Sequence, residues 1–264
     1  MISITIQQFA EDINHYVKLA LQGAIFIYPT DTIYGIGAII SPDTIKKINL
    51  IKQRQGEKHY SIIVPSYSWI EKHCDVSHNI NQLRIKRTQQ YGPITVLFPL
   101  KKKYISSDLT KNSSDSTIKP IIWHHPAPSS DITITFNPSL ITSNKLLGIR
   151  HFPKTSSPLE GDCFKESRSL REGTKEGHYH TMQHFVTQLS QPFISTSANI
   201  SGQPNITHPS QFSTLIQSID NSQTIWKSLN ILKSSEIIFI DAWPLTNRPS
   251  TIIDYQTGKA IPRT

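Results

Sequence analysis

Cysteine is scarce in this 264-residue sequence, and long hydrophobic runs are absent. Cys74 and Cys163 lie far apart and show no C-x-x-C spacing, which argues against a disulfide framework or a cysteine-based zinc site. We therefore expect both to be incidental thiols. A membrane helix needs roughly 20 consecutive apolar residues. No run of that length occurs, so we expect no membrane-spanning segment.

The sequence also lacks a secretory signal at its beginning. Its first residues, MISITIQQFAEDINHY, have neither the basic start nor the apolar core of such a signal. The expected location is therefore the cytoplasm.

The familiar phosphate-binding motifs are missing as well. No G-x-x-x-x-G-K-[ST] loop occurs, and YGIGA has two glycines without the third of a dinucleotide-binding turn. A nucleotide would have to bind by another arrangement. Candidates are Lys52, Arg54 and Lys58, which fall within seven residues, and the hydroxyl-rich stretch STSANISG after a predicted strand. Basic side chains, hydroxyls and turn N–H groups can all hold phosphate oxygens.

Basic residues are in excess, with 27 Lys and Arg against 19 Asp and Glu and a net charge of +8. This charge favours an acidic partner such as a nucleotide, a polyphosphate or RNA. It is spread along the chain and not gathered in one arginine-rich arm. Simple solubility is the alternative explanation for part of it.

The apolar residues follow alternating helical and strand periods. Helices are predicted within residues 9–21, 42–51, 182–189 and 212–219, and strands within 24–30, 60–64, 93–100, 146–152, 192–197, 236–240 and 250–254. Ser41 and Pro42 are a favourable helix start. This alternation predicts a single α/β domain, residues 1–264, built on one twisted sheet.

Two polar, turn-rich segments interrupt this pattern. Residues from 101 to about 131 and from 154 to about 178 show weak periodicity, which indicates surface insertions. A lid over a site is the alternative reading.

Several histidines could suggest a metal site. They are His124, His125, His178, His180 and His184. No H-E-x-x-H arrangement occurs and no cysteine joins them, so a solvated helix face is the favoured interpretation of the last three.

The stretch IYPTDTIYGIG, residues 27–37, combines a buried strand with a Pro-Thr-Asp-Thr cluster. Strand ends commonly carry sites, because a rigid sheet holds the hydroxyls and N–H groups of the following turn in place. An ordinary turn is the alternative. If it is a site, Thr30, Asp31 and Thr32 would form one wall of a pocket.

Six segments carry a family resemblance: YPTDTIYGIGA, IKQR followed by Lys58 and SIIV, YGPITVLFP, LGIRHFP, PFISTSANISGQP, and STIID with GKAIPR, in this order from Tyr28 to Arg263. Together they resemble the YrdC/Sua5 family of threonylcarbamoyl-AMP synthases. The coverage is similar to the short, single-domain form, here with insertions. The resemblance implies a YrdC-like α/β fold with a twisted sheet and a concave, basic face. Gln55 stands where the family usually has proline, and the chain ends in IPRT where Arg-x-Gly is usual.

The resemblance also implies a reaction. Family members are nucleotidyltransferases that combine L-threonine, bicarbonate or carbon dioxide, and ATP into threonylcarbamoyl-adenylate and pyrophosphate. A separate tRNA-modification machinery then transfers the threonylcarbamoyl group to adenosine 37 of tRNA, giving t6A. Mg²⁺ is expected with ATP. Two alternatives remain: the related module of hydrogenase-maturation carbamoyltransferases, and a non-catalytic, YrdC-like protein that binds RNA weakly through its basic face.

Site residues follow from the matching motifs. The resemblance implies that threonine is bound by Thr32, Tyr34, Arg150 and Ser195. It implies that ATP is bound by Lys52, Arg54, Lys58, Thr95, Ser197, Asn199, Ser201, Ser250 and Arg263. No covalent nucleophile, acid–base residue or metal ligand is assigned, because positioning and charge neutralisation should supply most of the rate.

Overall fold

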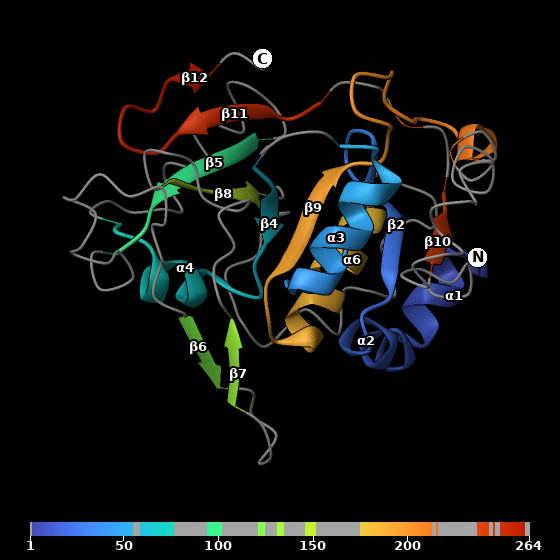
Figure 1. Cartoon of the computed structure of the whole chain (residues 1–264), viewed down its shortest axis with the longest axis horizontal. Helices are drawn as coiled ribbons and strands as arrows, with labels where there is room; N and C mark the ends of the chain where they lie inside the picture. The colour runs from blue at the N-terminus through green and yellow to red at the C-terminus, as the bar shows by residue number, and fades with distance from the viewer. Residues whose placement is uncertain are drawn as a thin grey trace.

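A mixed, twisted sheet of ten strands organises the chain (Figure 1). The computed structural model describes residues 2–54, 59–76, 94–101, 121–124, 131–134, 146–151, 175–212, 215, 237–242, 245 and 249–261. The strands, in their order across the sheet, are β1 (Ile2–Thr5), β10 (Ile237–Asp241), β2 (Ile25–Pro29), β3 (Tyr34–Gly37), β9 (Phe193–Ser197), β4 (Ser61–Ile63), β8 (Leu146–His151), β5 (Ile94–Pro99), β11 (Thr251–Asp254) and β12 (Ala260–Ile261).

Strand β9 joins the two halves of this sheet. It pairs antiparallel with β3 on one side and with β4 on the other. The register places Ser61 opposite Ser195, and farther along the sheet it places Thr95 of β5 opposite Arg150 of β8. Residues that are 55 to 134 positions apart in the chain therefore become direct neighbours.

Five α-helices with defined bounds flank the sheet within the described residues: α1 (Ile6–Glu11), α2 (Ile13–Leu21), α3 (Pro42–Ile51), α4 (Tyr67–His73) and α6 (Lys175–Leu189). A short 3-10 helix, η5 (Pro209–Gln211), follows β9. The predicted start of α3 is confirmed. The Ser41 side chain accepts a hydrogen bond from the Thr44 N–H, the Thr44 side chain accepts one from the Ser41 N–H, and Pro42 occupies the first helical position.

Two apolar cores lie on opposite faces of the sheet. Ile25 and Ile27 of β2 pack in the core that includes residues of α3 and α4, and we call this side the α3 face. Phe26 and Tyr28 of the same strand pack with α1, α2 and α6, on the α6 face. The division follows from the two-residue period of a strand, which sends neighbouring side chains to opposite faces.

Several predicted boundaries need correction. The helical stripe over residues 9–21 is two helices, because Asp12 caps α2 with its side chain and separates it from α1. The second predicted insertion, 154–178, ends too late, since α6 begins at Lys175. The first turns of α6 read KEGHYH, and their polar composition hides the helical period.

The first predicted insertion contains regular structure. Strand β6 (Ile121–His124) pairs antiparallel with β7 (Asp131–Ile134) as a separate two-stranded sheet. Figure 1 shows this hairpin extending away from the large sheet. The rest of residues 101–131, apart from Lys101, lies outside the described residues, as does 154–174 of the other segment.

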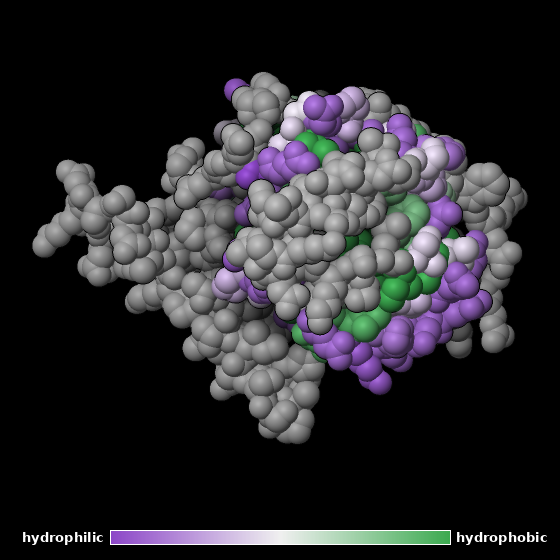
Figure 2. All heavy atoms as spheres, turned by 45° about the vertical axis from the view of Figure 1, so that its right-hand side comes forward, coloured by the Kyte–Doolittle hydropathy of each residue, from purple (hydrophilic) through white to green (hydrophobic). Residues whose placement is uncertain are grey.

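The surface around α1 and α2 is rimmed by hydrophilic residues, with a strip of hydrophobic residues inside the rim (Figure 2). Ile2 and Leu21 are the large hydrophobic residues that are exposed in the part of the chain that the structure describes. No helix there is long and apolar enough to cross a bilayer. Cys74 is buried, and burial raises the pKa of its thiol to about 12, so it stays protonated at neutral pH. Cys163 lies outside the described residues.

Candidate active site

Polar residues gather on the α6 face, on strands β9, β8 and β5. On β8 the side chains of Leu147 and Ile149 belong to the α3-face core, so Arg150 projects to the α6 face. The same alternation sends Thr95 of β5 and Ser195 of β9 to the α6 face. The α6-face core draws its strand residues from β2, β4, β9 and β10. The polar cluster therefore begins where that core ends.

The Pro-Thr-Asp-Thr cluster forms the turn between β2 and β3. The Thr30 hydroxyl accepts hydrogen bonds from the N–H groups of Thr32 (3.1 Å) and Ile33 (3.2 Å) and donates one to the Ile33 carbonyl (2.6 Å). One hydroxyl thus holds the whole turn. Gly35 allows this close approach, because a Cβ there would lie 3.0 Å from the Tyr28 ring and 3.2 Å from Thr30.

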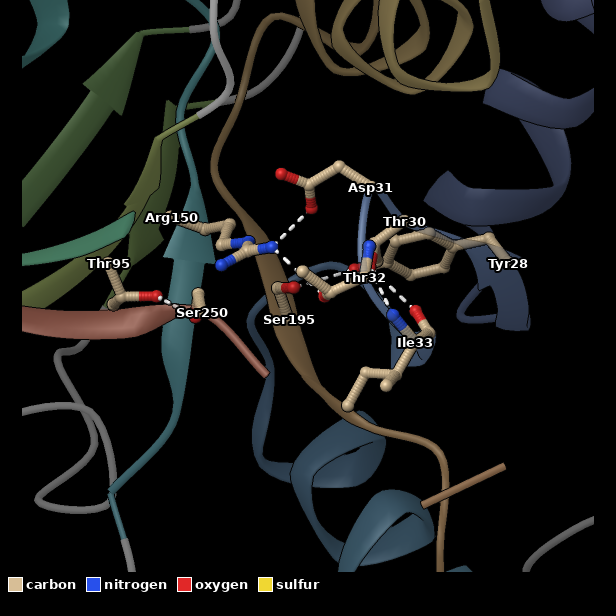
Figure 3. Close-up of polar contacts among 9 residues, drawn as sticks. All are labelled: Tyr28, Thr30, Asp31, Thr32, Ile33, Thr95, Arg150, Ser195 and Ser250. Atoms are coloured by element: carbon tan, nitrogen blue, oxygen red, sulfur yellow. Dashed lines mark hydrogen bonds and ion pairs between the residues drawn. The ribbon is translucent and has the colours of Figure 1, made fainter. Parts of the chain in front are cut away.

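This turn presents Asp31 and Thr32 to Arg150, as Figure 3 shows. Nη2 of Arg150 donates to Oδ1 of Asp31 and, at 3.2 Å, to the Thr32 hydroxyl. The ion pair is buried: the Arg150 and Asp31 side chains are 5% and 10% exposed. Burial raises the pKa of the Asp31 carboxyl, and the neighbouring guanidinium only partly offsets this effect.

Ser195 is fixed from two sides. The buried Tyr28 hydroxyl donates to its Oγ at 2.8 Å, and the Ser61 hydroxyl donates to its carbonyl oxygen at 2.7 Å. Burial raises the pKa of Tyr28 far above its ordinary value, so Tyr28 remains a donor. Because Ser195 Oγ accepts here, its own hydrogen can be donated to a bound molecule.

A second hydroxyl pair lies across the cluster. Thr95 and Ser250, each 6% exposed, hydrogen bond at 2.9 Å between their hydroxyl oxygens. Ser250 immediately precedes β11, which runs parallel to β5. In Figure 3 the Arg150 guanidinium lies between this pair and Asp31.

Lys52 is buried at the end of α3 and organises the loop that follows β9. Its Nζ donates to the carbonyls of Ser197 and Asn199 and to Oδ1 of Asn199. Its own carbonyl accepts from the Ser201 N–H at 2.8 Å. The Ser197 hydroxyl also donates to Asn199 Oδ1, at 2.6 Å. Lys52 therefore fixes the loop residues that were predicted to contact ATP.

Arg54, two residues after Lys52, has part of its guanidinium unused among the described residues. Its guanidinium carbon sits 4.4 Å from the centre of the Tyr60 ring. Its Nε and Nη1 have no hydrogen-bond partner among the described residues. A guanidinium that packs on an aromatic ring and keeps free N–H donors is well suited to bind an anion. Lys58 and Arg263 lie outside the described residues, so their predicted roles stay predictions.

The sequence profile of the Sua5/YciO/YrdC family, described as telomere recombination, matches residues 18–126. A curated relative, the threonylcarbamoyl-AMP synthase of Cellvibrio japonicus, is 30% identical over 88 residues, which are 33% of this chain and 46% of the relative. These matches support a place for the chain in the Sua5/YciO/YrdC family.

Solved structures agree with this family fold. P. abyssi Sua5 complexed with L-threonine aligns over 94% of this chain and 52% of that protein, with a TM-score of 0.51 and 15% identity. Full-length HypF in a phosphate- and nucleotide-bound form aligns over 94% of this chain and 28% of its own, with a TM-score of 0.52 and 12% identity. This chain therefore spans about half of the Sua5 protein, and such low identities show the fold alone.

Tyr34 does not join the polar cluster around Arg150, although the resemblance predicts that it shapes the threonine pocket. Its ring packs on Phe212 and Phe239 in the α3-face core. Its hydroxyl donates to the Ala242 carbonyl (2.8 Å) and accepts from the Ala242 N–H (3.1 Å). This position has a simple cause: the strand period turns Tyr34 to the face opposite Arg150.

Asp31 is the site residue that the sequence reasoning left unassigned. It was recognised as part of the turn, but its partner Arg150 lies 119 positions away. The sequence signal that could have indicated a site role for Asp31 is its position, as an acidic residue in the turn at the end of a strand and within a family motif. Nothing in the local sequence shows that this carboxylate meets a buried guanidinium.

The described residues contain no group of three or more His, Cys, Asp or Glu side chains that could hold a metal ion. The predicted solvated helix face is wrong for His184, which is half-buried and whose pKa is lowered by that burial. The side chains of His124, His125, His178 and His180 are not among those described. This site therefore offers no preformed metal centre in the described part of the chain.

Proposed function

We propose that this chain is an L-threonylcarbamoyladenylate synthase, a nucleotidyltransferase that uses L-threonine, bicarbonate or carbon dioxide, and ATP. The observation that carries the proposal is the buried guanidinium of Arg150 beside the Thr32 hydroxyl, with its Nη1 unpaired among the described residues. A named threonylcarbamoyl-AMP synthase among the relatives and a neighbour complexed with L-threonine support it.

The threonine side is built from Arg150, Thr32 and Ser195. A guanidinium is planar and always charged, so Arg150 suits a carboxylate better than a lysine would. The hydroxyls of Thr32 and Ser195 add two short polar contacts on the same face of the sheet. Both are held in place, Thr32 by the turn and Ser195 by Tyr28.

The chemistry needs positioning more than covalent catalysis. The amine nitrogen of threonine attacks the carbon of carbon dioxide and loses a proton, which gives a carbamate. A carbamate oxygen then attacks the α-phosphorus of ATP, and the bond from that phosphorus to pyrophosphate breaks. The reactants are anions that repel one another, so cationic side chains and oriented donors should supply most of the acceleration.

The nucleotide side would be formed by residues around the β9 loop. Arg54, with its unused donors, and the predicted residues Lys58 and Arg263 would neutralise the triphosphate. Thr95, Ser250, Ser197, Asn199 and Ser201 would add hydroxyl, amide and backbone contacts. Lys52 would act mainly through this loop, since three loop oxygens accept from its ammonium group.

Mg²⁺ would arrive with ATP. The ion keeps several waters and binds phosphates with few protein ligands, so the lack of a three-ligand cluster among the described residues is compatible with it. The product would pass to a tRNA-modification machinery that transfers the threonylcarbamoyl group to adenosine 37 of tRNA, and the net charge of +8 would favour weak RNA contact.

The proposal is tested with labelled bicarbonate. Purified protein is incubated with ATP and Mg²⁺, with and without L-threonine, and nucleotide products are separated. We expect label in a threonylcarbamoyl-adenylate only when threonine is present, and loss of that product in Arg150→Ala. Label-free nucleotides in every reaction would instead support the non-catalytic alternative.

A further inference from the structure

The Arg150–Asp31 pair leaves one atom of each partner unused. Nη2 of the guanidinium makes two hydrogen bonds, to Asp31 Oδ1 and to the Thr32 hydroxyl. Nη1 of Arg150 and Oδ2 of Asp31 are buried, and neither has a hydrogen-bond partner among the described residues. Buried polar atoms are rarely left unsatisfied, so this pair points to a missing ligand.

Asp31 itself is poorly compensated. Its carboxyl is largely removed from water, and this burial outweighs the favourable effect of Arg150 on its ionisation. A second cation at Oδ2 would therefore stabilise the carboxylate. Figure 3 shows that oxygen pointing away from Arg150, so a cation bound to it would not compete with the guanidinium for Oδ1.

We propose that Asp31 binds the ammonium group of the amino-acid substrate through Oδ2 while Arg150 binds its carboxylate through Nη1. The inference rests on the proposed function and deepens it by assigning the amine side of the substrate. An α-amino acid carries its two charges on adjacent groups, and the ion pair offers one unspent atom of each opposite sign.

The arrangement also explains a selectivity that Arg150 alone would not give. The ion pair and the zwitterion each carry no net charge, so binding buries no unbalanced charge. A ligand that lacks the ammonium would leave Oδ2 unpaired and would place its carboxylate near that of Asp31. The site should therefore select an α-amino acid over the matching hydroxy acid.

The test compares two ligands by isothermal titration at neutral pH. One is L-threonine, and the other is 3-hydroxybutanoate, which keeps the carboxylate and the hydroxyl and lacks the ammonium. In the wild type we expect threonine to bind roughly ten- to a hundredfold more tightly, the range of a contact to a charged group. In Asp31→Asn that preference should largely disappear, chiefly through weaker threonine binding.

A matched control is Asp43→Asn, which makes the same change at an exposed carboxylate paired with Lys47 on α3. It should keep the wild-type preference. If Asp31 only holds Arg150 in place, Asp31→Asn weakens both ligands equally and the preference persists, which overturns the inference. Equal binding of both ligands by the wild type overturns it too, even if Asp31→Asn does not fold. If the wild type still forms labelled adenylate in the bicarbonate assay, either of these two results overturns the inference about Asp31 and leaves the proposed function intact.

Discussion

Removal of the Arg150 guanidinium should destabilise the fold strongly, because it would leave Asp31 as a buried, uncompensated charge. The Asp31 side chain is only 10% exposed and loses its ion-pair partner in Arg150→Ala. Breaking a buried pair from one side typically costs about 3–5 kcal/mol. We expect a loss of that size in the free energy of unfolding at neutral pH.

The pH dependence gives this prediction its sign. The pKa of Asp31 in the folded protein is raised above its ordinary value of 3.8, chiefly by burial. Because the pKa is higher in the folded than in the unfolded chain, the protonated carboxyl of Asp31 favours folding. This contribution is complete at pH values below the unfolded pKa, and it is lost as the pH rises through the folded pKa. Without Arg150 the pKa rises further. Arg150→Ala should therefore regain stability between neutral pH and about pH 5, by more than the wild type does.

Urea denaturation at these two pH values measures the effect. The double variant Asp31→Asn with Arg150→Ala removes both charges, so it should recover about half of the loss or more and lose the added pH dependence. Asp43→Asn is the surface control, with a carboxylate that is 63% exposed and an expected change below about 1 kcal/mol. A loss below about 1 kcal/mol in Arg150→Ala would refute the buried-pair reasoning.

Three further predictions concern the two sides of the site. Thr32→Ala should weaken threonine binding and leave ATP binding largely unchanged, which titration with each ligand checks; unchanged threonine affinity would remove Thr32 from the site. Arg54→Ala should lower adenylate formation roughly ten- to a hundredfold. Its thermal midpoint should barely move, and full activity would contradict the assigned nucleotide contact. Lys52→Met should lower both the thermal midpoint and the activity, because three oxygens of the β9 loop lose their donor; lost activity at an unchanged midpoint would instead indicate a direct contact with ATP.

The long elements could be predicted from the sequence because their signals are local. The apolar runs of β2 and β9 and the Ser41–Pro42 start of α3 each lie within a few residues. Strand β3 was missed, since it has only four residues and two of them are glycines, which are disfavoured in strands. Its place is set by pairing with β2 and β9, which a single segment does not reveal.

The site residues were available from motifs, but their geometry was not. Tyr34 and Thr32 belong to the same motif, yet only Thr32 faces Arg150, because the face of Tyr34 depends on where β3 begins. The Asp31–Arg150 pair and the Lys52 contacts to the β9 loop join residues 119 and more than 140 positions apart. Such contacts follow from sheet order and register, and neither is encoded in a local pattern.

Pyrophosphate release tests the central claim most directly. Purified wild-type protein is supplied with ATP, Mg²⁺ and bicarbonate, and release is followed with and without L-threonine. Our account predicts release that depends on threonine and falls strongly in Arg54→Ala. Release at the same rate without threonine, or no release under either condition, would contradict the claim that this chain is a threonylcarbamoyl-adenylate synthase.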